Sequence, residues 1–277
     1  HPLASRHPLV SLADFDILRV LGKGSHGTVY LVRHHETNRL LAMKSLRKSS
    51  VLKKKQLENT IIELKFNAKL AREKSRCPYM ATLRFAFHSQ TRLFMLFDYC
   101  GGGELYFHLG RRGRLPETLA RFYAAEIAIS IGYLHASGVA YRDLKPENLV
   151  LDATGHVNLV DFGLCRLGVT SPVTGITSTS GTTEYLAPEV LAGHEHGLSV
   201  DWWAFGMVLY EFLFGLPPWF EDGVQDRIVA RVLARTPVTF PAGVDVSPRA
   251  KDLLSRLLVH DPRSRLGSGG GAREVMM

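Results

Sequence analysis

The sequence predicts an α+β protein in two lobes, a small β-rich lobe with one main helix and a larger, mostly α lobe. Its 277 residues exceed what a single compact core usually holds. Short apolar runs typical of strands fill the N-terminal part, and longer runs with helical spacing follow Gly101, Gly102 and Gly103. We therefore expect a small lobe over residues 1–97 and a hinge with the large lobe over residues 98–277.

The same patterns predict the individual elements. In the small lobe we expect three strands within residues 15–45, a helix over 56–72 and two strands within 83–99. At helical spacing, one face of that helix carries the apolar side chains Leu57, Ile61, Leu64 and Ala68. In the large lobe the sequence predicts helices over residues 116–137, 199–214, 223–234 and 247–258.

Composition narrows the class of protein. The hydrophobic and charged fractions are those of an ordinary globular chain, and the net charge of +8 comes without the interleaved aromatic residues of a nucleic-acid surface. Residues 202–220 are almost all apolar, but Glu211 and a Pro-Pro pair favour a buried helix over a membrane span. Cys77, Cys100 and Cys165 lack metal or disulfide spacing, which indicates a reduced intracellular setting.

A glycine-rich run, GKGSHGTV at residues 22–29, lies between two strand-like segments. The spacing G-x-G-x-x-G alone is weak, because dinucleotide-binding turns share it. A dinucleotide site would lead from the glycines into a helix, whereas here a further β-rich segment follows and carries Lys44. Glycines let backbone N–H groups approach a triphosphate, and Lys44 would place a positive charge on its α- and β-phosphates.

Three further motifs follow in order: YRDLKPEN at residues 141–148, DFG at 161–163 and APE at 187–189. With the glycine run and Lys44, they resemble the eukaryotic protein kinases over nearly the whole chain, from about residue 15 to 277. The runs YRDLKPENLVLD, DFGLC, EYLAPEVL, VDWW and DPRSRLG are similar to the AGC group, nearest to protein kinase B/Akt and the serum- and glucocorticoid-regulated kinases. The resemblance implies the bilobal protein-kinase fold, serine/threonine specificity, and ATP and Mg²⁺ as cofactors.

The resemblance also assigns catalytic roles. Asp143 would orient the acceptor hydroxyl and take its proton, although a structural turn aspartate is the alternative. Lys145 would neutralise the transferred phosphate, and Asn148 and Asp161 would hold Mg²⁺ through oxygen atoms. Nucleotide contacts are implied for Leu21, Gly22, Gly24, Gly27, Val29, Ala42, Lys44, the gatekeeper Phe97, the hinge residues Asp98 and Cys100, and Glu104.

A helix glutamate should pair with Lys44, and the sequence offers Glu58 and Glu63. They lie about 140° apart around a helix, so both cannot face the same site, and periodicity does not choose between them. The resemblance to the AGC pattern chooses Glu63.

Substrate specificity is implied by three carboxylates. Glu104, Glu147 and Glu211 match the positions by which arginine-directed AGC kinases read basic residues before the acceptor, and carboxylates bind guanidinium groups in bidentate fashion. For Glu211, a buried structural ion pair is the alternative. We expect protein substrates with basic motifs, no nucleic acid, no membrane insertion by this domain, and a monomer in the cytoplasm with nuclear shuttling as a second location.

Regulation is implied by the segment STSGTTE at residues 178–184. Ser178 matches the position at which an upstream kinase would phosphorylate and activate this chain, and Thr177 and Thr179 are alternative sites. Arg142 and Arg166 would bind the phosphate. The chain departs from the family pattern in this segment, where Thr179, Ser180 and Thr183 replace a phenylalanine, a cysteine and a proline. It also departs at two other positions: His26 replaces the aromatic residue usual at the tip of the glycine loop, and Asn59 stands where relatives often have a phosphate-binding histidine on the helix.

Three classes of function remain open: an active serine/threonine protein kinase, an ATP-binding pseudokinase or scaffold with little turnover, and a small-molecule phosphotransferase with a kinase-like core. The altered activation segment motivates the second, and the APE motif with its long preceding segment disfavours the third. The chain starts without methionine and stops at Met277, which indicates an excised domain without the C-terminal tail of AGC kinases.

Overall fold

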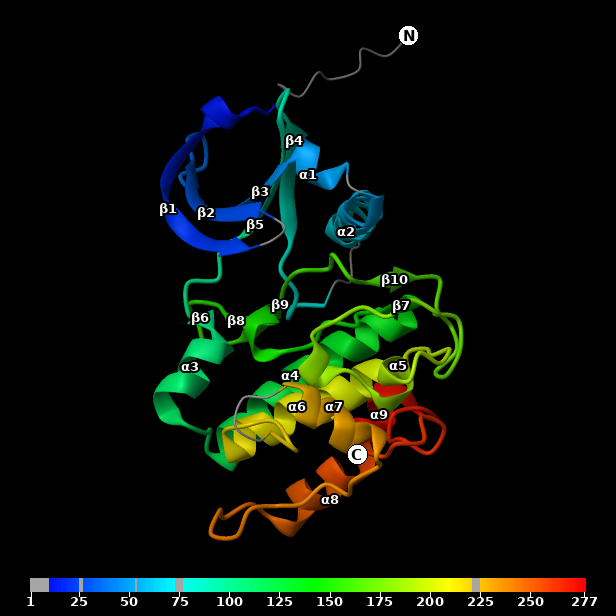
Figure 1. The fold of residues 1–277 in the computed structure, drawn as a ribbon. Helices are drawn as coiled ribbons and strands as arrows, with labels where there is room; N and C mark the ends of the chain where they lie inside the picture. Colours follow the sequence, from blue (N-terminus) through cyan, green and yellow to red (C-terminus); the bar gives the residue numbers. More distant parts are fainter. Residues whose placement is uncertain (1–9, 25–26, 53, 73–76, 221–224) are drawn as a thin grey trace. The chain divides into compact units, whose positions relative to one another are not determined.

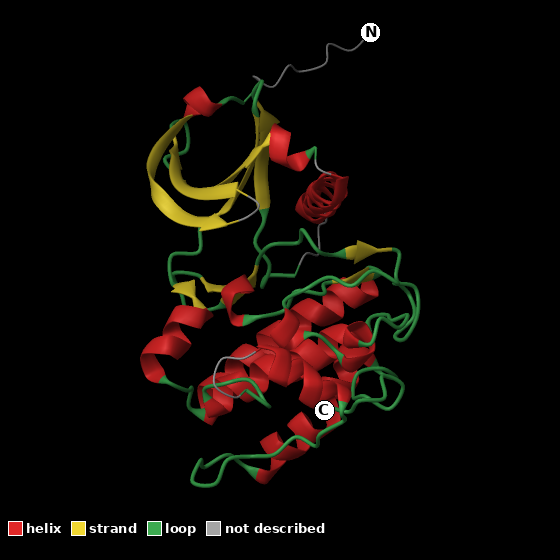
Figure 2. Ribbon diagram, in the orientation of Figure 1, coloured by secondary structure: helices red, strands yellow, loops and turns green. Residues whose placement is uncertain are grey.

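The computed structural model describes residues 10–24, 27–52, 54–72, 77–220 and 225–277. The chain divides into two compact units. The small unit comprises the described residues up to Arg72 together with 81–100, and the large unit comprises 77–80 with the described residues from Gly101 onward. The small unit is β-rich and the large unit is mostly helical, as expected (Figures 1 and 2).

An antiparallel five-stranded sheet in the order β1-β2-β3-β5-β4 forms the small unit. Its strands agree closely with the sequence-based prediction. They are β1 Phe15–Gly24, β2 Gly27–His34, β3 Leu40–Arg47, β4 Leu83–His88 and β5 Arg92–Asp98. A short 3-10 turn at Leu12–Asp14, capped by Ser11, precedes β1.

The two faces of this sheet are different. Leu41 and Met43 on β3 point into an apolar cluster with Phe15, Val32 and Leu96. Because side chains alternate along a strand, the intervening β3 residues point to the other face. There Leu46 packs with Leu83 and Met95 from β4 and β5 and with Val51 from the short helix α1, Lys48–Val51.

Helix α2, Lys54–Arg72, lies beside β4 (Figure 1). The face that packs inward carries Glu63, Phe66, Asn67 and Leu70, all buried. Three of the apolar residues that share a face in the sequence, Leu57, Ile61 and Leu64, are instead exposed. Periodicity located the helix and its apolar stripe, but the buried face is set by the contacts of Glu63 and Phe66 rather than by the stripe.

The large unit is built around helix α6, Ser199–Phe214, which is buried along almost its whole length. The helices predicted near residues 116–137, 199–214, 223–234 and 247–258 are present, although residues 223 and 224 lie outside the described part of the chain. Three short helices, over residues 105–112, 188–191 and 271–276, were not predicted. The remaining helices are α3 Leu105–Arg112, α4 Glu117–Ala136, α5 Pro188–Leu191, α7 Gln225–Leu233, α8 Pro248–Leu257 and α9 Gly271–Met276. Among the described residues, no helix has the length and apolar character to cross a membrane.

The large unit also contains two small antiparallel sheets of short strands. β8 Leu149–Leu151 and β9 Val157–Leu159 form a hairpin, with β6 Gly103–Glu104 on the other edge of β8. A second pair joins β7 Val139–Ala140 to β10 Arg166–Leu167. Two 3-10 turns, Pro146–Asn148 and Thr183–Tyr185, lie next to the predicted catalytic and activation-segment residues.

Candidate active site

The glycine run forms the end of β1 and the start of β2. Gly24 pairs with Gly27, and residues 25 and 26, including the predicted tip residue His26, lie outside the described part of the chain. Gly27 has a φ of +145°, and a Cβ there would overlap the carbonyl oxygen of Ser45. Among the described residues, no heavy atom lies within 4 Å of a Cβ position at Gly22 or Gly24, which leaves space beside their backbone.

Strand register gathers several of the predicted nucleotide residues on one face of the small sheet. Val29 lies opposite Lys44, and Ala42, two residues before Lys44, lies opposite Phe97. Directly paired residues share a face of an antiparallel sheet, and so do residues two apart on one strand. Leu21 lies at an irregularity of β1, next to Gly22, which pairs with Val29. Leu21, Val29, Ala42 and Phe97 are half-buried, as befits residues that line an accessible surface.

Lys44 pairs with Glu63. Its Nζ lies 2.7 Å from Oε1 and 2.9 Å from Oε2 of Glu63, and the two side chains are only 14% and 4% exposed. Glu58, the other candidate, is exposed. Glu63 therefore occupies the position that the family resemblance assigned to it and that periodicity could not decide.

The predicted hinge begins at Asp98. Its carboxylate accepts two hydrogen bonds from Nε of Arg84, at 2.8 and 3.0 Å, and one from Nη2. Its backbone N–H donates to the carbonyl oxygen of Thr82. The side chain and amide of Asp98 thus hold β4 against β5, and its carbonyl oxygen lies 4.0 Å from the Cys100 Sγ.

In the large unit, Asp201 at the start of α6 holds the predicted catalytic loop. Its fully buried carboxylate accepts hydrogen bonds from the backbone N–H groups of Tyr141 and Arg142, at 2.8 and 2.7 Å, and contacts Nε2 of His135 at 2.8 Å. Arg142 adopts a left-handed φ of +70°. These two hydrogen bonds hold the strained turn that immediately precedes Asp143.

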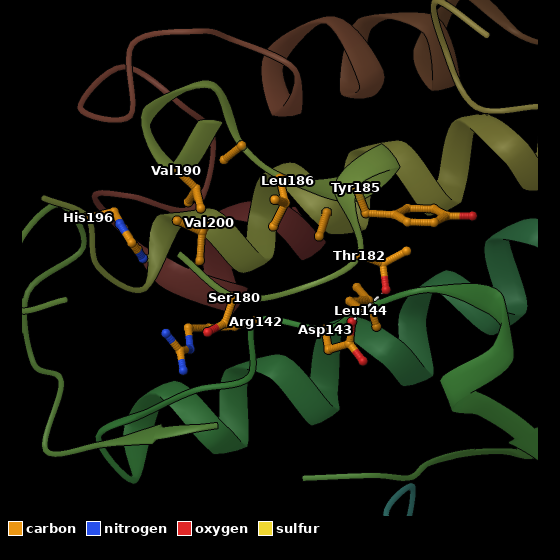
Figure 3. Close-up of a pocket in the computed structure, with 12 residues that line it drawn as sticks. Arg142, Asp143, Leu144, Ser180, Thr182, Tyr185, Leu186, Val190, His196 and Val200 are labelled. Atoms are coloured by element: carbon orange, nitrogen blue, oxygen red, sulfur yellow. Dashed lines mark hydrogen bonds between the residues drawn. The ribbon is translucent and has the colours of Figure 1, made fainter. Parts of the chain in front are cut away.

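Asp143 lies in a cluster of polar groups. Its Oδ1 accepts a 2.9 Å hydrogen bond from the Thr182 hydroxyl, and its Oδ2 lies 2.9 Å from Nδ2 of Asn148 and 3.1 Å from Nζ of Lys145. Lys145 also donates to the Thr182 hydroxyl at 2.7 Å. Figure 3 shows Thr182 close to Asp143 beside a small cavity that Tyr185 and Leu186 help to line. These three contacts fix the direction of the Asp143 carboxylate.

The β8–β9 hairpin brings the two predicted metal ligands together. Asn148 precedes β8 and Asp161 follows β9, and the Val160 N–H donates to the Asn148 carbonyl. Both bonds of the Asn148 amide nitrogen go to Asp143, so Oδ1 is its group suited to a cation. Asp161 has a left-handed φ of +55°. An amide oxygen and a carboxylate fit Mg²⁺, which takes few protein ligands and completes its shell with phosphate and water. No group of three or more metal-ligating His, Cys, Asp or Glu side chains occurs in the described part of the chain.

The predicted substrate carboxylates interact with one another. Burial and the nearby charge of Glu147 raise the pKa of Glu104. Burial also raises the pKa of Glu211, to about 7, against the lowering effect of a 2.7 Å hydrogen bond from the Tyr185 hydroxyl. Glu147 and Glu184 raise it further by repulsion.

An internal ion pair, the alternative reading of Glu211, is not seen: among the described residues its side-chain partner is Tyr185. One oxygen of Glu147, Oε2, is buried without a hydrogen-bond partner in the described part of the chain. These carboxylates repel one another, and one oxygen of Glu147 lacks a hydrogen-bond partner among the described residues. Both features favour the binding of a positively charged group that is not part of the chain. Glu184 and Tyr185 were not predicted as site residues, although both lie in the run EYLAPEVL.

The predicted phosphosite lies against Arg142. Nη1 of Arg142 is 3.0 Å from the Ser178 hydroxyl oxygen, while its Nε donates to the Leu164 carbonyl. Ser178 and both competitors, Thr177 and Thr179, are exposed, and so is Arg166. Of the three hydroxyls, the structure places that of Ser178 in contact with an arginine.

Comparison with known proteins agrees with this geometry. The protein kinase domain family matches residues 15–276. The RAC-beta serine/threonine-protein kinase A of Xenopus laevis is 42% identical over 275 residues, 99% of this chain and 54% of that protein. Human serine/threonine-protein kinase Sgk2 is 44% identical over 271 residues, 98% of this chain and 71% of that protein.

The chain spans about half the length of the first of these relatives. Such relatives confirm the resemblance to the Akt and serum- and glucocorticoid-regulated kinases of the AGC group. The chain belongs to the protein kinase domain family.

Proposed function

We propose that this domain is a serine/threonine protein kinase that transfers the γ-phosphate of ATP, bound with Mg²⁺, to hydroxyl groups of arginine-directed protein substrates. The observation that carries the proposal is the cluster around Asp143, whose carboxylate is held by Thr182, Lys145 and Asn148. Serine/threonine kinases are also what the similar proteins are named.

Each residue has a role that its contacts support. Asp143 would orient the substrate hydroxyl and accept its proton, because Asn148 and Thr182 fix the direction of its carboxylate. Lys145, 2.7 Å from the Thr182 hydroxyl, would stabilise charge on the transferred group. Mg²⁺, held by Asn148 Oδ1 and Asp161, would supply positive charge to the phosphates.

In the small unit, Lys44 would contact the α- and β-phosphates while Glu63 holds its ammonium group in place. The open backbone at Gly22 and Gly24 would accommodate the phosphates, and Leu21, Val29, Ala42 and Phe97 the adenine. Asp98 and Cys100 would bind the adenine edge through their backbone, and Glu104 the ribose.

Substrates and regulation follow from the remaining side chains. Glu104, Glu147 and Glu211 would bind arginine side chains before the acceptor residue, since their carboxylates repel one another without a cation. Phosphorylation of Ser178 by an upstream kinase would add charge next to Arg142. We place the domain in the cytoplasm, as a monomer.

Transfer of radiolabelled phosphate from Mg·ATP to an arginine-rich serine peptide tests the proposal, with Asp143→Asn as the inactive control. Labelled peptide is expected with the unmodified chain and background labelling with the variant. A chain whose melting temperature rises with Mg·ATP but that labels no peptide would be an ATP-binding scaffold. Labelling of small molecules but of no peptide would indicate the third class of function.

A further inference from the structure

A buried amide on helix α2 is not explained by the proposed reaction. Asn67 has no exposed surface, and its neighbours on the buried face, Phe66 and Leu70, are apolar. Its Nδ2 donates a 2.8 Å hydrogen bond to the backbone carbonyl of Glu63. Its Oδ1 is buried and has no hydrogen-bond partner among the described residues. Buried acceptors of this kind are uncommon in folded proteins and call for an explanation.

Asn67 is joined to the Lys44–Glu63 pair by the geometry of the helix. Residues four apart in an α-helix lie on the same face, one turn from each other. The side chains of Glu63 and Asn67 therefore enter and leave the interior together. Any movement of α2 that returned Oδ1 of Asn67 to water would also draw the Glu63 carboxylate away from Lys44.

The two side chains have opposite effects on this packed position. Glu63 stabilises it through two contacts with the Lys44 ammonium, at 2.7 and 2.9 Å. Asn67 opposes it, because an acceptor buried without a partner loses its hydrogen bonds to water. The second donor that Asn67 offers to the Glu63 carbonyl adds little, since that carbonyl already lies in the i to i−4 ladder of the helix.

We propose that Asn67 is a positioning residue that keeps the Lys44–Glu63 pair reversible, by lowering the population of the packed position of α2 in which the pair forms. The cost of an unpaired buried acceptor corresponds to a factor of roughly 5 to 150 in that equilibrium. The chain then binds nucleotide less tightly than its contacts allow, because part of the binding free energy is used to restore the packed position. The last consequence rests on the proposed function, in that ATP is the ligand.

Asn67→Leu is the direct test, since leucine has the same branching at Cγ and removes both polar atoms. We expect hydrogen exchange of the α2 amides, measured without nucleotide, to slow by about 5- to 150-fold. Asn59→Leu is the matched control, the same replacement at a half-exposed position of the same helix, and should leave exchange nearly unchanged. Asn67→Met, with a flexible side chain, replaces leucine if packing is tight.

The binding of Mg·ATP, measured by calorimetry, separates positioning from packing. Asn67→Leu should tighten it by up to the factor seen in exchange, and the gain should vanish in a Glu63→Gln background, because the pair is then missing. Faster exchange in both the leucine and methionine variants would overturn the proposal and point to a water molecule that satisfies Oδ1. If exchange slowed but the affinity for Mg·ATP did not change, Asn67 would affect only the packing of α2, and its proposed positioning role would be wrong. A chain that exchanges as expected but binds no Mg·ATP would contradict the proposed function and not the α2 equilibrium.

Discussion

Lys44 on β3 and Glu63 on α2 form a largely buried ion pair, with Nζ 2.7 Å from Oε1. The pair links the sheet of the small unit to its main helix. Removing one partner would leave the other charge buried without compensation, which costs more than the pair itself contributes.

Glu63→Gln should therefore lower the free energy of unfolding by on the order of 3 kcal/mol and weaken ATP binding. Glu58→Gln, an exposed position on the same helix, is the matched control and should change neither. Urea unfolding and calorimetry with Mg·ATP measure the two effects. Equal behaviour of the two variants would show that the pair has no role in stability or binding.

Asp143→Asn should lower kcat by roughly 10²–10⁴ with little change in the affinity for ATP, because Asp143 acts on the acceptor hydroxyl. Asp152→Asn, in the turn of the β8–β9 hairpin, is the control and should retain turnover. Steady-state assays with a serine peptide distinguish them. Normal turnover of Asp143→Asn would return Asp143 to the alternative of a structural turn aspartate.

Glu211 should make arginine recognition depend on pH. Its pKa of about 7 means that arginine, which needs the charged carboxylate, binds better as the pH rises through that value. The ratio of kcat/KM for an arginine peptide to that for its norleucine analogue should increase from about pH 6 to about pH 8. Glu211→Gln should abolish the increase, and Glu36→Gln, at an exposed site, should retain it. A ratio independent of pH would exclude Glu211 from the subsite.

The same raised pKa of Glu211 has a consequence for stability. The folded chain holds a proton that the unfolded chain releases between the ordinary pKa of 4.5 and about 7. The contribution of Glu211 to the free energy of unfolding therefore falls as the pH rises through this window. Urea unfolding of Glu211→Gln should show a shallower fall, and an unchanged slope would contradict the raised pKa.

His156 should give pH dependence from a separate site. The Glu126 carboxylate, 2.5 Å from its Nδ1, raises the pKa of His156 above its ordinary value of 6.5. The charged pair thus contributes stability below pH 6.5 that is lost as the pH rises through the folded pKa. His156→Gln should remove this part of the melting-temperature profile, and His194→Gln, at an exposed position, should not. If the pH profiles of the melting temperature were the same for both variants, protonation of His156 would not contribute to stability.

Phosphorylation of Ser178 should raise peptide turnover, because the phosphate would meet Arg142, now 3.0 Å from the hydroxyl. Ser178→Ala should block activation by an upstream kinase, whereas Thr177→Ala and Thr179→Ala should leave it intact. We expect only partial activation, since Asn59 supplies no positive charge from α2, and Asn59→His should increase it. Equal turnover of the unphosphorylated and phosphorylated chains would remove Ser178 as the switch.

Motifs and strand patterns were predictable from the sequence because they depend on neighbours in the chain. Alternating apolar residues located all strands of the small sheet, and helical spacing located α4, α6, α7 and α8. The short helices α1, α3, α5 and α9 were missed, since so few turns give little periodicity. The glycine run, Lys44, Asp143 and Asp161 also occur along the sequence in the order typical of the family, and this order was enough to indicate it.

Which face of α2 is buried was decided only by the tertiary structure. Periodicity could not choose between Glu58 and Glu63, although the family resemblance did, because the choice depends on how α2 is rotated against the sheet. The apolar stripe of Leu57, Ile61 and Leu64 faces outward against the usual rule. Local sequence determines that a helix forms, because its hydrogen bonds join residues four apart. The face that it buries depends on contacts between distant segments, and here the ion pair of Glu63 with Lys44 and the packing of Phe66 set it, at the cost of burying Asn67.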